Sequence, residues 1–501
     1  MRNFYLTTPI YYVTARPHLG HAYTTVVADA VARWHRLLGD SVHFLTGTDE
    51  HGLKVQQYAA GAGKSPQAFV DEVSPLYEQA WRRLGISHDD FIRTTEPRHR
   101  RGVEALLQRC YDRGDIELGI YAGKYCVACE EYYTDDELRH PGGLCPIHGR
   151  PVDYYEEENY FFRLSRYQDR LLEWYEAHPT AILPTFRRNE VVGVIRSGLR
   201  DFSVSRSSLT WGIPLPWDPA HVAYVWFDAL ANYLSAIGYG RDDERFAAQW
   251  PAFHLLGKDI VRQHCIYWPA MLLSAGLPLP AGWAIGGHLL SGGQKMSKTT
   301  GNVVSPIDLA NDVGVDAFRY YLLADTPYGQ DGDFSYEGLI RRYNGDLANN
   351  LGNLVSRVAT LVAKTCDGIG PAPGGGGELA DVAATAVRRA ADAWRIVAPD
   401  QALQATWSLL DAANGHLERQ QPWKQPHGPL VDRILGDALE ALRIIAILAS
   451  PVLLETSQHI WARIGLGGQV QAQRLPVALE WGGYPGGLPV TVHAPLFPRR
   501  S

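Results

Sequence analysis

The first residues whose types and spacing suggest chemistry are two histidines near the start of the chain, His18 and His21. An apolar run at residues 4–10 predicts a buried strand before them, and apolar residues recur at helical spacing over residues 22–38. The histidines therefore fall where a strand has ended and a helix begins. A helix start offers unpaired N–H groups and a partial positive charge, and Gly20 removes a side chain that would keep a ligand away. The spacing predicts an anion site, with an ordinary polar turn as the alternative.

A second group with phosphate-binding chemistry lies far along the chain, in a glycine-flanked loop that contains Lys295, Ser297 and Lys298. Paired lysines usually belong to a solvated basic loop, and the phosphate interpretation gains weight because this loop accompanies the histidine pair. Another glycine-rich stretch, residues 61–65, resembles a P-loop but has Tyr58 where that motif needs glycine. We expect residues 61–65 to be an ordinary loop.

Cysteine and histidine spacing indicates a metal site. Six cysteines in 501 residues are too few for a disulfide scaffold. Two residues separate Cys126 from Cys129, two separate Cys145 from His148, and fifteen residues lie between the two pairs. Three thiolates and one imidazole suit tetrahedral zinc and leave no open coordination position. We expect one structural zinc ion in a reducing compartment; the alternative is that the cysteines are neighbours by chance.

The elements that must position these groups follow a strand–helix–strand order. Residues 42–46 read as a second buried strand, which ends close to Asp49. In a parallel βαβ unit, ligands bind beyond the carboxyl ends of the strands. His18, His21 and Asp49 should therefore share one crevice. Helices are expected at residues 67–84 and 98–114, and strand-like runs return at residues 222–227 and 253–257.

The order of these patterns predicts the fold class. It is α/β, with a doubly wound (Rossmann-like) parallel sheet split by a zinc-containing insertion and followed by an all-α helical bundle. The bundle is expected from apolar residues at helical spacing in residues 347–362, 381–396, 401–420 and 431–450. The predicted division is 1–114 and 226–292 for the two halves of the sheet domain, 115–225 for the insertion, 293–345 for the lysine loop region, 346–464 for the helices and 465–501 for a Gly/Pro-rich tail.

Composition limits the class of protein and its partners. Hydrophobic residues make up 46% and charged residues 20%, as in a soluble globular protein. No apolar run approaches the roughly 20 residues that span a bilayer, and the first residues lack the plan of a signal peptide. We expect a cytoplasmic protein without a membrane partner. The net charge of −7 means that any nucleic acid must be met by a local basic patch.

The histidine pair and the lysine loop together resemble the HIGH and KMSKS signatures of class I aminoacyl-tRNA synthetases, with Thr299 in place of the usual serine. Five further strings, in order and at suitable spacing, are similar to the methionyl-tRNA synthetase family: PIYY at 9–12, FLTGTDEHG at 44–52, YVWFDAL at 224–230, GKDI at 257–260 and YWPAML at 267–272. With the zinc knuckle and the helices, the resemblance covers about residues 3–460.

The resemblance implies an ATP-dependent, AMP-forming ligase required for translation. Methionine carboxylate would attack the α-phosphorus of ATP, accompanied by Mg²⁺, and the methionyl group would pass to the terminal ribose of tRNA(Met), including initiator tRNA. His18, Gly20, His21, Lys295, Ser297 and Lys298 match the ATP side, and the two histidines and two lysines among them are the implied catalytic residues.

The same resemblance implies a methionine pocket. Asp49 would pair with the α-ammonium group, a charge-assisted contact that also orients the carboxylate. Further pocket positions are matched by Ile10, Tyr12, Trp226, Ala229, Leu230, Tyr233, Asp259, Gln263, His264 and Trp268. Aromatic rings suit a thioether, since sulfur–aromatic contacts contribute about 0.3–1.5 kcal/mol. From the residues alone, Tyr233 and Trp268 would be interpreted as core. Gln263 stands where many relatives have an aromatic residue, so we expect a reshaped pocket there.

For tRNA, the resemblance assigns anticodon binding to residues 346–464 and a stem contact to residues 293–345. Asn353 and Arg357, one helical turn apart, and Trp423 match anticodon-reading positions, and a stacking aromatic with hydrogen-bonding neighbours suits a single-stranded loop. A monomer is favoured. The alternatives are another class I synthetase, and a non-catalytic tRNA- or RNA-binding paralogue, which would have lost the histidines or lysines.

Overall fold

The structure is a computed structural model that describes residues 2–126, 131–133, 135–139, 143–147, 149–295, 303–375 and 377–500. Four of the predicted site residues lie outside these ranges: Cys129, His148, Ser297 and Lys298.

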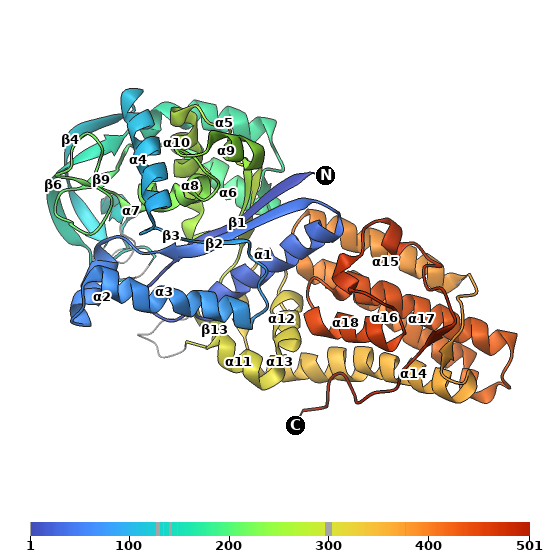
Figure 1. Ribbon diagram of the computed structural model, residues 1–501. Helices are drawn as coiled ribbons and strands as arrows, with labels where there is room; N and C mark the ends of the chain where they lie inside the picture. The colour runs from blue at the N-terminus through green and yellow to red at the C-terminus, as the bar shows by residue number, and fades with distance from the viewer. Residues whose placement is uncertain are drawn as a thin grey trace.

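A six-stranded parallel sheet, in the order β3-β2-β1-β11-β12-β7, forms the centre of the N-terminal part (Figure 1). Its strands are β1 (Asn3–Tyr12), β2 (Ser41–Asp49), β3 (Asp90–Arg93), β11 (Ala252–Gly257), β12 (Gly282–Gly286) and β7 (Ile182–Leu183). The chain starts in the middle at β1 and moves outward through β2 and β3. On the other side, the edge strand β7 comes first in the sequence, and β11 and β12 then fill the space between it and β1. This order confirms the predicted doubly wound sheet.

Helices cover both faces of this sheet, which explains why its central strands are apolar along most of their length. The predicted helices are confirmed within a few residues as α1 (Leu19–Leu37), α3 (Pro66–Arg83) and α4 (Pro97–Asp112). In Figure 1, α1 and α3 lie on one side of the sheet, and α4 and α10 (Trp268–Ala275) lie on the other.

The strand predicted at residues 222–227 is wrong over most of its length. Only β10 (Val222–Ala223) is extended, and it pairs with β9 (Ser205–Arg206) outside the main sheet. The chain then forms the helix α7 (Val225–Leu230), followed by α8 (Asn232–Ser235). Because α7 is buried on almost all sides, it shows no polar face in the sequence, and a short apolar run of this kind reads equally well as a strand.

Residues 115–225 contain a second, antiparallel sheet in the order β5-β4-β6-β8. Its strands are β4 (Ile116–Cys126), β5 (Glu131–Tyr133), β6 (Asp153–Phe162) and β8 (Phe202–Ser203). The same segment also contains β7, which pairs with β12 at the edge of the main sheet. The chain therefore returns to the main sheet inside the segment that we expected to interrupt it.

The C-terminal part is helical, as expected, in α14 (Asn353–Thr365), α15 (Glu378–Arg395), α16 (Pro399–Gln420), α17 (Pro429–Ala449) and α18 (Leu454–Arg463). A π-helical segment, Tyr343–Gly352, leads into α14, so the helix predicted at residues 347–362 spans two helical types. None of the helices in the described ranges is both long and apolar enough for a membrane span.

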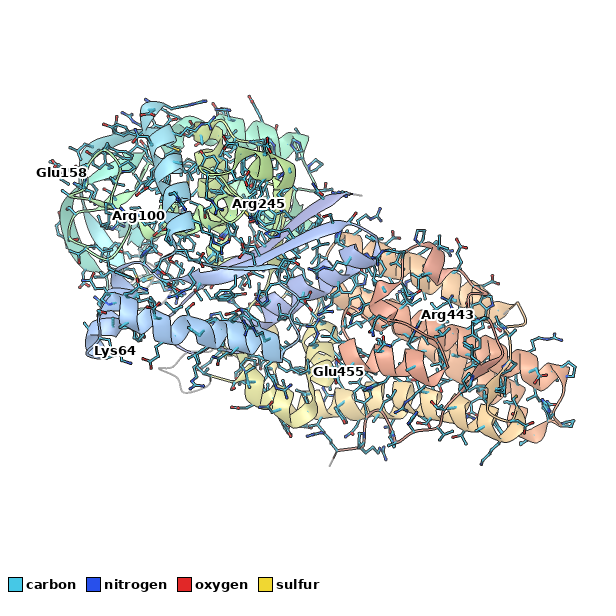
Figure 2. The ribbon with its side chains drawn as sticks, viewed as in Figure 1. Lys64, Arg100, Glu158, Arg245, Arg443 and Glu455 are labelled. Atoms are coloured by element: carbon cyan, nitrogen blue, oxygen red, sulfur yellow. The ribbon has the colours of Figure 1, made fainter. Side chains whose placement is uncertain are left out.

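Residues 465–500 pack against the helices as extended chain with short turns. Arg443 of α17, labelled in Figure 2, donates to both carboxylate oxygens of Glu440 and to the carbonyls of Ala478 and Glu480. Glu440 in turn accepts the backbone N–H groups of residues 482–484. This buried ion pair fixes the tail against α17.

A buried carboxylate, Asp29, joins the sheet domain to the C-terminal helices. Asp29 lies in the middle of α1, and its Oδ2 accepts from Arg319 at 2.6 Å and from Arg33 at 2.8 Å. Its Oδ1 accepts from the backbone and hydroxyl of Ser87. Burial would raise the pKa of the Asp29 carboxyl, but the two arginines hold it well below its usual range.

Arg319, in α12 (Val315–Ala324), carries this connection onward. Its guanidinium is fully buried and also donates to the carbonyls of Leu84, Pro451 and Val452. Pro451 and Val452 lie in the turn between α17 and α18. One buried ion pair therefore connects α1, the end of α3 and the C-terminal helices.

Replacing Arg319 by methionine should lower the free energy of unfolding by about 3–5 kcal/mol, because the variant leaves a buried carboxylate with one cation fewer. Arg82→Gln is the matched control, since it breaks only the exposed pair with Glu78 and should cost less than about 1 kcal/mol. Denaturant unfolding of the two variants measures the difference. Equal losses would contradict the role of this ion pair.

Candidate active site

A cavity of about 350 Å³ opens at the carboxyl edge of the main sheet. The ends of β1, β2 and β11 contribute Tyr12, Asp49 and Gly257 to its wall, and Gly287 follows the end of β12. The strand order reverses between β1 and β11, and this is where ligands bind in open α/β sheets. The position of the cavity therefore follows from the topology.

Thirteen of the predicted ATP and methionine residues line this cavity, although they come from segments as far apart as β1 and residue 264. They are Ile10, Tyr12, His18, Gly20, His21, Asp49, Trp226, Ala229, Leu230, Tyr233, Asp259, Gln263 and His264. Trp268 does not line it. Its indole Nε1 donates to Nε2 of the buried His254, and its ring packs edge-on against Tyr233, so Trp268 supports the wall from behind.

The two histidines of the first motif have defined proton positions. His18 caps α1: its Nδ1 accepts from the N–H of Gly20 at 3.1 Å, and its own backbone N–H donates to Nδ1 of His21 at 3.3 Å. A ring nitrogen that accepts from a backbone N–H carries no proton, so each neutral ring holds its proton on Nε2. Burial, with a smaller effect of His18, lowers the pKa of His21 well below its usual value. Both rings can therefore donate to an anion.

Gly20 and the hairpin that leads to the lysine loop form the rest of the cavity wall near the two histidines. A Cβ on Gly20 would lie 3.0 Å from the ring of His18, so only glycine leaves the two stacked imidazoles undisturbed. Beside the cavity, β13 (Leu289–Ser291) pairs with β14 (Gln294–Lys295) through a turn in which Gly292 and Gly293 both have positive φ. Leu289 lines the cavity, so the hairpin brings the backbone of Lys295 to this side, while Ser297 and Lys298 lie beyond the described residues.

The side of the cavity formed by Trp226, Tyr233 and His264 offers mainly ring surface, and His264 is held neutral. Nδ1 of His264 contacts the carbonyl of Ile260 at 2.9 Å and must therefore carry the proton, which leaves Nε2 to accept from the Tyr233 hydroxyl at 2.8 Å. Burial lowers the pKa of His264 to about 4. The hydroxyl and the imidazole satisfy each other, so Tyr233 and Trp226 can present ring surface to an apolar ligand group.

A buried carboxylate, Asp228, holds the wall that carries this apolar surface. Its oxygens contact His51 Nδ1 at 2.7 Å and His99 Nε2 at 2.6 Å. Burial alone would raise the pKa of the Asp228 carboxyl, but the two histidines more than offset this effect and lower it to about 2. Since His51 follows Asp49 by two residues and Asp228 lies in α7, the contact fixes the end of β2 against the helix that bears Trp226.

Gln263 begins a π-helical turn, Gln263–Tyr267, that precedes α10. Such turns occur often at functional sites because they redirect side chains within a helix. The side chain of Gln263 is buried, and its Oε1 has no hydrogen-bond partner among the described residues. This amide can offer a hydrogen bond to a ligand where an aromatic side chain could not.

Sequence reasoning missed several groups around the cavity. Lys54 Nζ lies 5.6 Å above the ring of Tyr12, and His288 and Ile147 also line the wall. The Asp228 contacts were missed as well, because they join residues up to 177 positions apart. No spacing rule links these partners.

The other predicted sites are partly described. Cys126 and Cys145 are buried together with Tyr133 and Leu138 at the end of β4, while Cys129 and His148 lie outside the described residues. In the C-terminal helices, the guanidinium of Arg357 lies 4.5 Å from the ring of Trp423 and contacts Glu418 at 2.6 Å. Trp423 is 40% exposed, and Asn353 is exposed one turn before Arg357.

Comparison with known proteins agrees with this geometry. The profile of the family "tRNA synthetases class I (M)" matches residues 4–151 and 141–359. The methionine-tRNA ligase of Streptomyces coelicolor is 46% identical over 99% of this chain and 96% of that protein. The chain belongs to the methionyl-tRNA synthetase family. As a member of this family it is an enzyme, an ATP-dependent aminoacyl-tRNA ligase of class I.

Other relatives in the family extend the comparison. The methionine-tRNA ligase of Thermotoga maritima is 43% identical over 99% of this chain and 80% of its own length. The solved structure of Mycobacterium tuberculosis methionyl-tRNA synthetase in complex with methionyl-adenylate superposes with a TM-score of 0.94 at 41% identity, and each chain is fully covered. The apo form of that synthetase gives a TM-score of 0.88 at 38% identity, covering 100% of this chain and 99% of that one.

His264 should remain neutral, with its proton on Nδ1, from pH 8 down to about 5, because its pKa is lowered to about 4. Protonation below that range would turn Nε2 into a donor and remove the acceptor of the Tyr233 hydroxyl. Histidine ¹⁵N spectra, with the signal assigned by its loss in His264→Gln, measure the titration. A midpoint near the ordinary value of about 6.5 would contradict this description of the pocket.

Proposed function

We propose that this chain activates L-methionine with ATP in the cavity described above and transfers the methionyl group to the terminal ribose of tRNA(Met). The observation that carries this proposal is the convergence of thirteen residues, matched to two separate ligands, on one cavity at the topological switch point. Membership of the methionyl-tRNA synthetase family supports the same substrates.

In the first step, Asp49 pairs with the α-ammonium of methionine and turns its carboxylate toward ATP. The thioether lies against the rings of Tyr233 and Trp226, and Gln263 borders the same space. This arrangement selects a ligand with one charged end and one apolar, polarisable end.

A carboxylate oxygen of methionine then bonds to the α-phosphorus of ATP, and the bond from that phosphorus to the bridging oxygen of pyrophosphate breaks. Catalysis of such a transfer depends on positioning and charge stabilisation. His18 and His21 donate from Nε2 to the phosphates, and Lys295 and Lys298 hold the departing pyrophosphate. Mg²⁺ accompanies ATP as part of the substrate.

The second step uses tRNA, whose terminal ribose hydroxyl attacks the adenylate and releases AMP. Trp423, backed by the Arg357 guanidinium, offers an exposed ring on which an anticodon base can stack, and Asn353 offers an amide on the same face. We assign residues 346–464 to anticodon binding, residues 293–345 to the lysine loop and stem contact, and residues 115–225 to the inserted domain.

Zinc is the ion that suits the knuckle in this insertion. The two described ligands, Cys126 and Cys145, are both buried in one small cluster, as a closed structural site requires. Cys126, Cys129, Cys145 and His148 would hold the ion, which would stabilise a segment with little apolar core of its own. We also propose that the enzyme is a monomer and works in the cytoplasm.

The function is tested by charging tRNA. The purified protein should attach labelled methionine to tRNA(Met) in the presence of ATP and Mg²⁺, with AMP released in equal amount. A non-catalytic RNA-binding paralogue would bind the tRNA but leave it uncharged. That outcome would overturn the proposed function.

Asp49→Asn should raise the KM for methionine about 10- to 150-fold, because it removes one charged partner of the ammonium group. The KM for ATP should change little, since the phosphate-side histidines are untouched. Steady-state kinetics of adenylate formation measure both constants. If the KM for methionine and the KM for ATP rose by the same factor, the Asp49 carboxylate would support the fold of the site and not bind the amino acid.

Lys298→Ala should slow adenylate formation by about two orders of magnitude or more, because the pyrophosphate loses a charged donor in the transition state. Methionine affinity, measured by fluorescence titration, should change little. Lys64→Ala, in the glycine-rich stretch that lacks a full P-loop motif, serves as the matched control and should leave the rate unchanged. Normal pyrophosphate exchange in Lys298→Ala would refute its role.

Trp423→Ala should weaken binding of cognate tRNA(Met) about 5- to 150-fold, the effect of losing about 1–3 kcal/mol of base stacking. Binding of a tRNA(Met) with an altered anticodon should not change, so the variant loses discrimination. Filter binding of the two tRNAs to both proteins measures it. An equal loss for both tRNAs would mean that Trp423 does not read the anticodon.

A further inference from the structure

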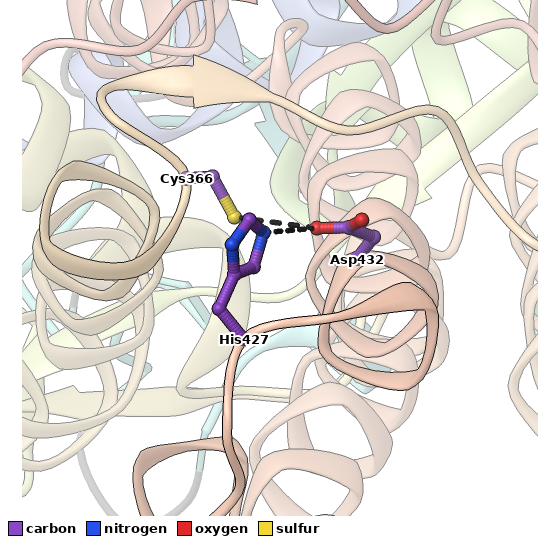
Figure 3. A group of neighbouring side chains, drawn as sticks. All are labelled: Cys366, His427 and Asp432. Atoms are coloured by element: carbon purple, nitrogen blue, oxygen red, sulfur yellow. Dashed lines mark hydrogen bonds and ion pairs between the residues drawn. The ribbon is translucent and has the colours of Figure 1, made fainter.

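A second group of metal-ligand side chains lies among the C-terminal helices, away from the knuckle and the cavity. It consists of Cys366, directly after α14, His427, in the loop before α17, and Asp432, in the first turn of α17. Figure 3 shows the three side chains pointing toward one another from separate chain segments. One ligand atom of each lies within 4.8 Å of the other two.

The distances suit a tetrahedral ion. Cys366 Sγ lies 3.7 Å from Asp432 Oδ1, and His427 Nε2 lies 3.1 Å from the same oxygen. Bonds of about 2.3 Å from zinc to sulfur and about 2.0 Å to nitrogen and oxygen separate tetrahedral ligand atoms by about 3.3–3.5 Å. Both distances fall within a few tenths of an ångström of that spacing, and the ligand atoms of Cys366 and His427 lie within 4.8 Å of each other.

We propose that Cys366, His427 and Asp432 bind a divalent transition-metal ion, with Zn²⁺ favoured by the sulfur, nitrogen and oxygen ligands. The side chains of His427 and Asp432 are 56% and 43% exposed, so solvent reaches the group. This exposure gives an ion its entry path and leaves the fourth position to water, unlike a closed structural site. The thiolate formed on binding and the carboxylate balance the charge of the ion.

An ion bound at this group would connect chain segments on either side of the pair Arg357 and Trp423. His427 follows Trp423 by four residues, and Cys366 ends the helix that carries Arg357. A bound ion would link the loop after α16 to the end of α14, at two points flanking the pair Arg357 and Trp423. The binding itself does not depend on the proposed function, and its test uses the metal alone.

The test titrates chelator-treated protein with Zn²⁺ and with Co²⁺, whose thiolate charge-transfer absorption reports sulfur ligation. The wild type should bind one more equivalent of metal than Cys366→Ser or His427→Ala. In these two variants, the affinity for metal at the Cys366 site should be at least 100-fold lower than in the wild type. Asp367→Asn is the matched control and should bind as wild type, because Asp367 is adjacent but outside the group and asparagine tolerates its positive φ.

Methionine-dependent pyrophosphate exchange should be unchanged in all three variants, which verifies that they are folded. Equal stoichiometry and affinity in the wild type, Cys366→Ser and His427→Ala would show that the group is only a hydrogen-bonded cluster and would overturn the proposal. Loss of an equivalent in Asp367→Asn as well would also overturn it, because the effect would not be specific to the three ligands.

Discussion

The buried ion pair between Asp29 and Arg319 fixes the geometry on which the rest of the molecule depends. Asp29 lies in α1, the helix that His18 caps, and Arg319 holds the turn between α17 and α18 through two carbonyls. A second acid in α12, Asp316, accepts the first N–H groups of α18. Because a buried charge is costly unless it is fully partnered, these contacts leave α1 little freedom relative to the C-terminal helices. The cavity histidines His18 and His21 and the C-terminal helices are therefore held in a fixed arrangement.

The hydrogen bonds around the cavity also fix which ring nitrogen of each histidine carries the proton. His18 and His21 accept backbone N–H groups at Nδ1, which puts the proton of each neutral ring on Nε2, whereas His264 uses both ring nitrogens on protein groups. The same residue type thus places ring Nε2–H groups on one side of the cavity and a fully hydrogen-bonded imidazole on the other. Asp228 and its two histidines keep these sides at a constant separation, since they join the end of β2 to α7.

The sequence allowed prediction of features that depend on local pattern. The first strands and the helices α1, α3, α4 and α15 to α17 were found within a few residues. The strands are continuous apolar runs bounded by turn residues, and the helices repeat apolar residues at helical spacing over several turns. The start of α7, residues 225–227, was mistaken for part of a strand because burial on almost all sides removes the periodicity that distinguishes helix from strand. Trp268 was assigned to the pocket, but tertiary packing places it one layer behind. The contacts of Asp228 and the group at Cys366 depend on residues more than 60 positions apart, and no local pattern encodes them.

One cavity at the carboxyl edge of the sheet should activate methionine without help from tRNA. ATP–pyrophosphate exchange by the purified protein, with each of the twenty amino acids in turn and in the absence of tRNA, tests this activity. We expect rapid exchange with methionine alone, since only that side chain combines the length and polarisability that the apolar wall accepts. Exchange that is absent for every amino acid, or fastest with one other than methionine, would contradict it.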